Sequence, residues 1–125
     1  MNPIQLIYLA NILVAGWVGV HSLFFTRHAA VYLYQGVYPA SDAIKITGAL
    51  WLAIALLSLF GLWLPERFAA VLLLQLIYKG GWLLFVALPG LIEKESFPVG
   101  IASFFLVWVL ILPFVIPWDK LFTTI

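Results

Sequence analysis

Four long runs of apolar residues, separated by short polar stretches, dominate the chain. They cover residues 3–25, 42–64, 66–88 and 98–117. Each is close to the roughly 20 mostly apolar residues that a helix needs to cross a bilayer. A backbone in hydrocarbon must also satisfy its own hydrogen bonds, which favours helices. We therefore predict an all-α integral membrane protein, a four-helix bundle forming a single transmembrane domain over residues 1–125, with both termini on one side.

The polar stretches predict how these helices are connected. Residues 64–67, Leu-Pro-Glu-Arg, are short enough to make an antiparallel hairpin of the second and third helices. The Pro89-Gly90 pair is predicted to end the third helix. The connection from Arg27 to Ala40 is longer and rich in tyrosine, which favours the membrane–water interface. We expect it to be an interfacial segment between helices 1 and 2, with a short helix as far as Gly36.

Composition agrees with a membrane location. Of the 125 residues, 66% are hydrophobic and 9% are charged, whereas soluble domains carry roughly 25% charged residues. A net charge of +1 implies no nucleic-acid partner, and the absence of cysteine excludes disulfides and thiolate metal sites. No positive charge precedes the first apolar run, so we expect a retained helix and not a cleaved signal peptide. The expected location is a bacterial inner (cell) membrane.

Lys79 is the most unusual residue because it stands near the middle of the third predicted helix. A lysine at that depth costs about 3 kcal/mol to insert. Gln75, four residues earlier, shares its helix face. We take both as candidates for binding a ligand or partner; Lys79 could instead snorkel towards the Glu93 loop or cross-link two helices. Asn11 of the first helix has a depth similar to that of Gln75, which predicts a hydrogen bond between them.

Two stripes of small and polar residues predict close helix packing. In the first helix the stripe consists of Asn11, Ala15, Gly19 and Ser22. In the second helix it consists of Asp42, Lys45, Ala49 and Ala53. Asp42 and Lys45 are candidates for ligand or partner binding, and the simpler interpretation is a salt bridge at the interface.

His21 is the last candidate for ligand or partner binding. With His28 it suggests a metal or tetrapyrrole site, but a neutral, hydrogen-bonded His21 fits the end of the first helix better. By depth, His21, Asp42, Lys45 and Lys79 belong to the same half of the bilayer. We therefore predict a polar pocket that opens to that side only.

Motifs for catalysis and metal binding are missing from the sequence. It has no nucleophile elbow, no H-E-x-x-H pattern and no phosphate-binding glycine loop. No carboxylate lies deep in a predicted span, which disfavours proton-driven transport. We expect no catalytic residue and no metal site, and an enzyme is disfavoured.

Part of the chain resembles the DoxX-like superfamily of small four-helix membrane proteins. The resemblance rests on Ile46-Thr47-Gly48-Ala49-Leu50, on residues 59–68 (LFGLWLPERF) and on residues 74–79 (LQLIYK). It implies a membrane subunit of an oxidoreductase complex, in some members facing the quinone pool. Lys45 and Thr47 stand where many members carry an acidic residue, and no catalytic residue is carried over.

These features together predict a non-catalytic integral membrane subunit that anchors or stabilises a larger membrane protein complex. One alternative is a DoxX-like component of a quinone-linked oxidoreductase, with a quinone head group near His21, Lys45 and Lys79. Another is a small oligomeric channel or carrier. The expected partners are the lipid bilayer and other membrane protein subunits or copies of the chain itself. The sequence requires no cofactor, and quinone is the one that these alternatives suggest.

Overall fold

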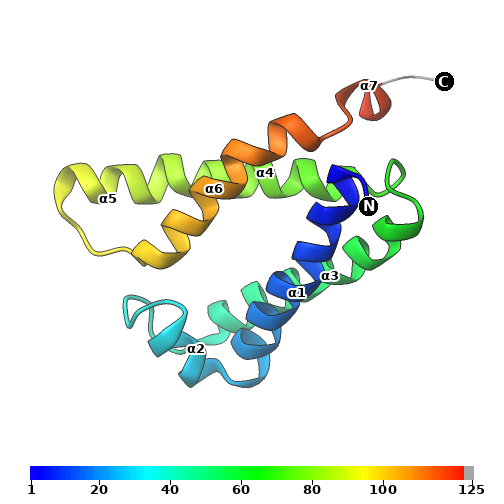
Figure 1. The fold of residues 1–125 in the computed structure, drawn as a ribbon. Helices are drawn as coiled ribbons and strands as arrows, with labels where there is room; N and C mark the ends of the chain where they lie inside the picture. Colours follow the sequence, from blue (N-terminus) through cyan, green and yellow to red (C-terminus); the bar gives the residue numbers. More distant parts are fainter. Residues whose placement is uncertain (123–125) are drawn as a thin grey trace.

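The computed structural model describes residues 1–122, and these fold as helices joined by turns, without strands (Figure 1). The elements are α1 (Pro3–Phe24), α2 (Thr26–Tyr32), α3 (Asp42–Trp63), α4 (Ala70–Trp82), α5 (Leu88–Glu93), α6 (Val99–Val115) and α7 (Trp118–Leu121). A π-helical turn, Leu83–Ala87, makes α4 and α5 one continuous helix. Three helices of the described chain are long and apolar enough to cross a membrane: α1, α3 and the joined helix Ala70–Glu93. The all-helical prediction is confirmed, but α6, with 17 residues, is shorter than the fourth predicted span.

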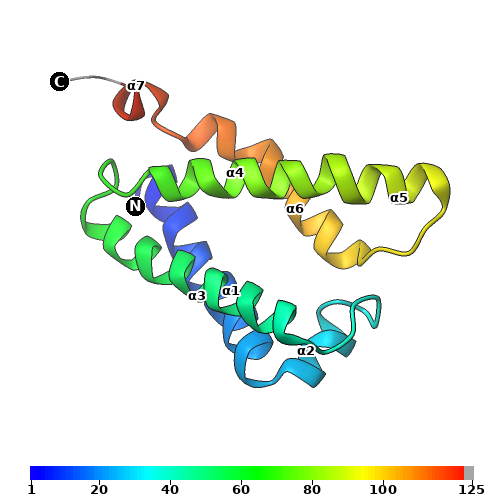
Figure 2. The ribbon, with the colours of Figure 1, turned by 180° about the vertical axis from the view of Figure 1, so that it is seen from behind.

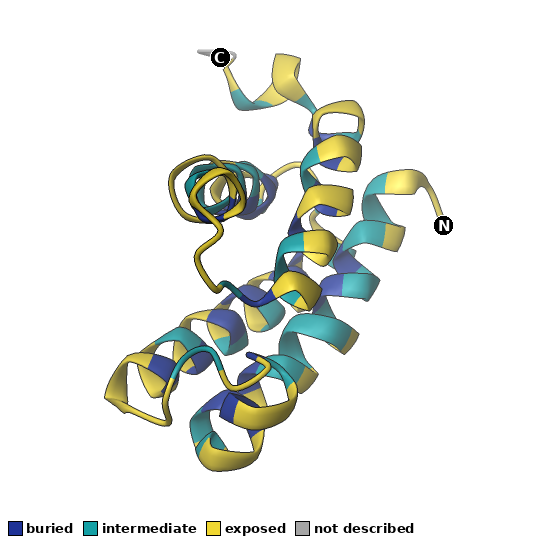
Figure 3. Ribbon diagram, turned by 90° about the vertical axis from the view of Figure 1, so that its left-hand side faces the viewer, coloured by how far each residue is buried: buried dark blue, intermediate teal, exposed yellow. Residues whose placement is uncertain are grey.

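The long helices form two pairs that meet at one end and diverge at the other (Figures 1 and 2). α1 packs along α3, and α4 packs against α6. In the view of Figure 3, α4 is seen end-on with its buried residues towards α6. Both described ends of the chain lie at the closed end, where α3 leads into α4. The turn after α3 therefore joins two pairs, and α3 and α4 do not pack along each other as the predicted hairpin would; the four-helix bundle stays a prediction.

Glycines allow α1 and α3 to come into backbone contact. A Cβ atom added to Gly48 would lie 2.7 Å from the backbone nitrogen of Leu23 and 2.8 Å from Cβ of Ser22. One added to Gly19 would lie 2.9 Å from the carbonyl oxygen of Gly48. Asn11, Gly19 and Ser22 are all buried, so the small stripe predicted for the first helix is confirmed as a packing surface. This contact explains why α3 pairs with α1.

The stripe predicted on the opposite face of α3 does not pack against another helix within the described chain. Asp42, Lys45, Ala49 and Ala53 are all exposed, and no ion pair joins the two charged residues in the described chain. The buried face instead carries Ile44, Gly48, Trp51, Ile54, Ser58 and Gly61. Glycine permits a closer approach than alanine, and charged side chains at a helix end are more favourable outside a helix contact.

Tyr8 holds the closed end together. Its hydroxyl donates a 2.6 Å hydrogen bond to the carbonyl oxygen of Pro65, in the turn between α3 and α4. Its ring fills the space beside Gly61, where a Cβ atom would come within 2.7 Å of it. Leu72 of α4 and Leu112 of α6 are fully buried with it. Because the turn occupies residues 65–69, α4 begins at Ala70 and not at residue 66 as predicted.

Pro89-Gly90 does not end the third long helix, which continues to Glu93. Proline has no N–H group, and in a regular α-helix its ring would clash with the carbonyl group four residues earlier. The π-helical turn lies just before it, and the N–H of Leu88 bonds to the carbonyl oxygen of Leu83, five residues back. A π-helical turn is wider than an α-helical one, and the helix can therefore carry the proline without stopping.

The segment between α1 and α3 contains α2, which ends at Tyr32 and not near Gly36 as predicted. The chain then turns through Gln35 (φ 56°) and Gly36 (φ 73°), both in the left-handed region. The side-chain oxygen of Gln35 accepts a 2.9 Å hydrogen bond from the backbone N–H of Gly100. This bond connects the turn to the first residues of α6, on the open side of the molecule. The interfacial location of the segment stays a prediction.

Candidate functional site

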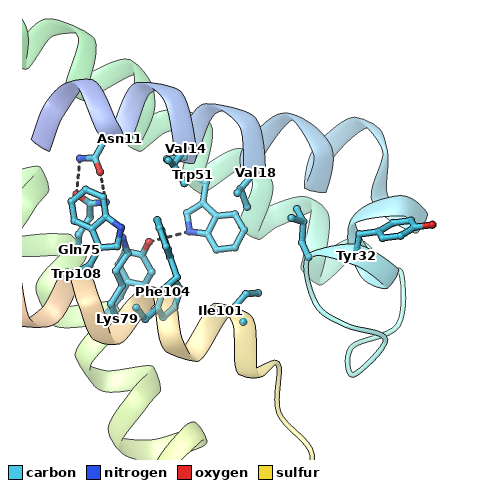
Figure 4. Close-up of a pocket in the computed structure, with 15 residues that line it drawn as sticks. Asn11, Val14, Val18, Tyr32, Trp51, Gln75, Lys79, Ile101, Phe104 and Trp108 are labelled. Atoms are coloured by element: carbon cyan, nitrogen blue, oxygen red, sulfur yellow. Dashed lines mark hydrogen bonds between the residues drawn. The ribbon is translucent and has the colours of Figure 1, made fainter. Parts of the chain in front are cut away.

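A cavity of about 330 Å³ lies between the two pairs of helices (Figure 4). We call it the Lys79 cavity. Its lining comes from α1, α3, α4 and α6, with Tyr32 and Leu33 from the end of α2. It begins next to the buried closed end and extends to exposed residues, among them Tyr32 and Gly100. The divergence of the two pairs thus creates a partly open site between them.

Two polar side chains, Asn11 and Gln75, line the inner end of this cavity and are hydrogen-bonded to each other, and Asn11 is also bonded to the buried Ser58. The amide nitrogen of Asn11 donates to the amide oxygen of Gln75 at 2.8 Å and to the hydroxyl oxygen of Ser58 at 3.1 Å. The amide nitrogen of Gln75 donates back to the amide oxygen of Asn11 at 3.0 Å. The predicted hydrogen bond between Asn11 and Gln75 is confirmed. It links α1 to α4, and therefore one helix pair to the other.

Lys79 is buried among aromatic rings next to this network. Its side chain is 4% exposed. The ammonium nitrogen lies 4.6 Å from the centre of the Trp108 ring and 5.4 Å from that of Phe105, with Tyr78 and Phe104 at 5.8 and 5.9 Å. No acidic residue lines the cavity within the described chain. The snorkelling interpretation is therefore wrong, because the side chain ends against α6 and not at the surface.

A second hydrogen bond separates this cavity from a neighbouring one. The indole nitrogen of Trp51 donates to the hydroxyl oxygen of Tyr78 at 3.0 Å, from α3 to α4. On the far side is a cavity of about 480 Å³ lined by the start of α3 and by Tyr34, Tyr38 and Trp82, among others. Burial raises the pKa of Tyr34 to about 12, so this hydroxyl stays protonated. The Trp51–Tyr78 pair is thus part of the wall between two spaces.

Hydrogen-bond donors are in excess around the Lys79 cavity. The hydroxyl oxygen of Tyr78 accepts a hydrogen bond from Trp51, but its own hydrogen has no acceptor among the described residues. The same holds for the ammonium group of Lys79 and the indole N–H of Trp108. Because Asn11 and Gln75 are bonded to each other, they do not accept from Tyr78, Lys79 or Trp108. A bound ligand with acceptor atoms would satisfy these three donors best.

The other predicted candidates do not reach either cavity. Asp42 and Lys45 point outward at the start of α3. The Nδ1 atom of His21 lies 2.9 Å from the carbonyl oxygen of Trp17, one turn earlier, so His21 is hydrogen-bonded as expected. Its ring lies 5.7 Å from that of His28. The predicted pocket that combines these residues with Lys79 is therefore wrong, since they share its depth but not its side of the helices.

Two aromatic residues of the site, Trp51 and Trp108, were not among the predicted candidates. Tryptophan favours the membrane–water interface, yet both lie near the middle of their helices and are buried. The sequence signal that could have identified them is a tryptophan in the middle of an apolar helix, away from the interface, because its N–H then needs a partner inside the protein.

The described residues contain no group of three or more histidine and carboxylate side chains placed to hold a metal ion. What the cavity offers is an apolar and aromatic surface with donors at its inner end, an arrangement suited to binding. Comparisons with protein-family models, with curated proteins and with solved structures found no match, so the resemblance to the DoxX-like superfamily stays a prediction.

Proposed function

We propose that this chain is a non-catalytic integral protein of a bacterial inner membrane that holds a lipid-soluble molecule in the Lys79 cavity. In this proposal α1, α3, the joined helix Ala70–Glu93 and α6 all cross the bilayer. The observation that carries it is the buried ammonium group of Lys79, which faces a cavity without a carboxylate in its described lining.

The four crossings can be tested by labelling, because the natural chain has no cysteine. Single cysteines at Glu66, Lys94 and Phe122 occupy exposed positions after α3, after α5 and after α7. We expect a membrane-impermeant thiol reagent to label Glu66→Cys and Phe122→Cys from one side and Lys94→Cys from the other. If Phe122→Cys and Lys94→Cys are labelled from the same side, α6 does not cross the membrane.

The ligand role follows from the energetics of Lys79. An uncompensated charge is expensive to bury, and such residues within membrane helices commonly face a partner or a cavity. Cation–π contacts with rings contribute about 0.5–2 kcal/mol, but rings are poor hydrogen-bond acceptors for an ammonium group. A molecule with an apolar body and an acceptor head group would supply what Lys79 lacks.

Substitution of Lys79 tests this role. We expect the Lys79→Met variant, purified from membranes in mild detergent, to retain at least ten-fold less of the lipid-soluble ligand than the natural protein, because the charged donor is gone. Organic extraction followed by mass analysis measures the retained ligand. The absorption spectrum of the extract identifies a quinone if one is present.

Lys45→Met is the matched control, because it removes the same charge from an exposed position outside both cavities. It should retain as much ligand as the natural protein. A natural protein that carries no lipid-soluble molecule and binds none when exposed to a lipid extract would contradict the proposal. Equal retention by Lys79→Met would contradict it as well.

An anchoring subunit of a larger membrane complex is the second candidate. It is favoured by the outer face of α3, where Ala49 and Ala53 are exposed one turn apart and offer a second small surface for another helix. Retention of a second protein chain without any ligand, in the same purification, would favour this candidate over the first.

A further inference from the structure

The inner end of the Lys79 cavity accepts only one kind of head group. The four rings around the ammonium group attract its charge but leave its hydrogens without good acceptors. Tyr78 and Trp108, whose side chains carry an O–H and an N–H, also line the cavity. A hydroxyl or amine head group would bring further donors to a place that already has too many. The head group must therefore be an acceptor.

Charge balance narrows the choice among acceptors. A neutral carbonyl, such as that of a quinone, would accept a hydrogen bond from Lys79 but leave a positive charge in an apolar surrounding. A carboxylate would accept the same bond and also neutralise the charge, which removes the cost of leaving an ammonium group unpaired in an apolar surrounding. Because no acidic residue lines the described cavity, this negative charge must come from the ligand.

The rest of the cavity is lined by apolar side chains that a hydrocarbon chain can contact. From Lys79 it continues past Val14 and Phe104 to Val18 and Ile101, all apolar, as Figure 4 shows. Ligand cavities in proteins measure about 300–1,000 Å³, and this one lies at the small end with about 330 Å³. A two-chain phospholipid is a poor fit to that volume, whereas one chain with a small head group fits.

We propose that the Lys79 cavity binds a single-chain carboxylate, an amphiphile of the fatty-acid class. Its carboxylate pairs with Lys79 and accepts from Tyr78 or Trp108, and its chain extends towards Tyr32 at the opening. This inference rests on the proposed function of the cavity and specifies the ligand for it.

Binding of matched probes to the full chain tests the inference. Native mass spectrometry in mild detergent, at neutral pH, compares dodecanoate with dodecan-1-ol, which has the same chain and a neutral head group. We expect dodecanoate to bind the natural protein at least ten-fold more tightly. Lys79→Met should bind both probes equally weakly, and Lys79→Arg should keep the preference for the carboxylate. Lys45→Met should behave as the natural protein does.

Three results would overturn the inference while leaving the proposed ligand role intact. The first is equal binding of dodecanoate and dodecan-1-ol by the natural protein, a comparison that needs no variant. The second is tighter binding of a short-tailed quinone than of dodecanoate. The third is tighter binding of phosphatidylglycerol, an anion with two chains. If none of these four probes binds the natural protein, both the inference and the ligand role are contradicted.

Discussion

Replacing Gly48 by alanine should lower the free energy of unfolding by about 1–2 kcal/mol, because overpacking a tight contact costs up to about 3 kcal/mol and the better helix propensity of alanine offsets about 1 kcal/mol of it. The added Cβ atom would come within 2.9 Å of three atoms of α1, of which two belong to the backbone. Backbone atoms cannot turn aside as a flexible side chain does. α1 and α3 must therefore separate, and the hydrogen bond from Trp51 to Tyr78 weakens with them.

Gly80→Ala is the matched control. Gly80 also lies inside a helix, but a Cβ atom there would meet nothing within 4 Å. Alanine is better than glycine in a helix interior by about 1 kcal/mol, so this variant should be as stable as the natural protein or more stable. Unfolding in mixed detergent, followed by tryptophan fluorescence, measures both variants. A Gly48→Ala variant as stable as Gly80→Ala would mean that α1 and α3 do not touch as described.

Lys79→Met should raise the free energy of unfolding of the ligand-free protein by about 1–2 kcal/mol. Methionine fills nearly the same space and removes the cost of a buried charge, about 3 kcal/mol in a membrane helix. The loss of the cation–π contacts opposes this gain and costs about 0.5–2 kcal/mol. A residue that weakens the fold is typical of a functional site, because stability is commonly lower where binding or activity requires it.

The measurement is unfolding of delipidated protein in the same mixed detergent. Lys45→Met should stay within about 0.5 kcal/mol of the natural protein, as surface substitutions usually do. A Lys79→Met variant that is clearly less stable than the natural protein would show that Lys79 is mainly structural. That result would support the cross-linking interpretation of this residue.

Depth along a helix could be predicted from the sequence because each residue adds a fixed rise of 1.5 Å. Asn11 and Gln75 were placed at similar depth on this basis, and their side chains are hydrogen-bonded. The direction of a side chain around its helix was harder to predict. His21 and Lys45 have the depth of the cavity but lie on other sides of α1 and α3.

The reason is that helices of this composition are apolar all round. Contrast between a polar and an apolar face, which identifies the inside of a soluble helix, is nearly absent here. Small residues occur on two faces of α3, one with Ala49 and Ala53 and one with Gly48 and Ser58, and in the structure the second face is buried. The π-helical turn before Pro89 was also not predictable, because the same dipeptide ends many helices.

The unequal lengths of the two helices in one pair have a consequence for an inserted protein. The joined helix Ala70–Glu93 has 24 residues and α6 has 17, so they are roughly 36 and 25 Å long. In a hydrocarbon core about 30 Å thick, the longer helix can match by tilting, by bending or by thickening the bilayer around it, whereas α6 is too short to tilt far. A change in bilayer thickness therefore acts unequally on the two helices that line the cavity, because a thinner membrane favours a larger tilt of the joined helix than of α6.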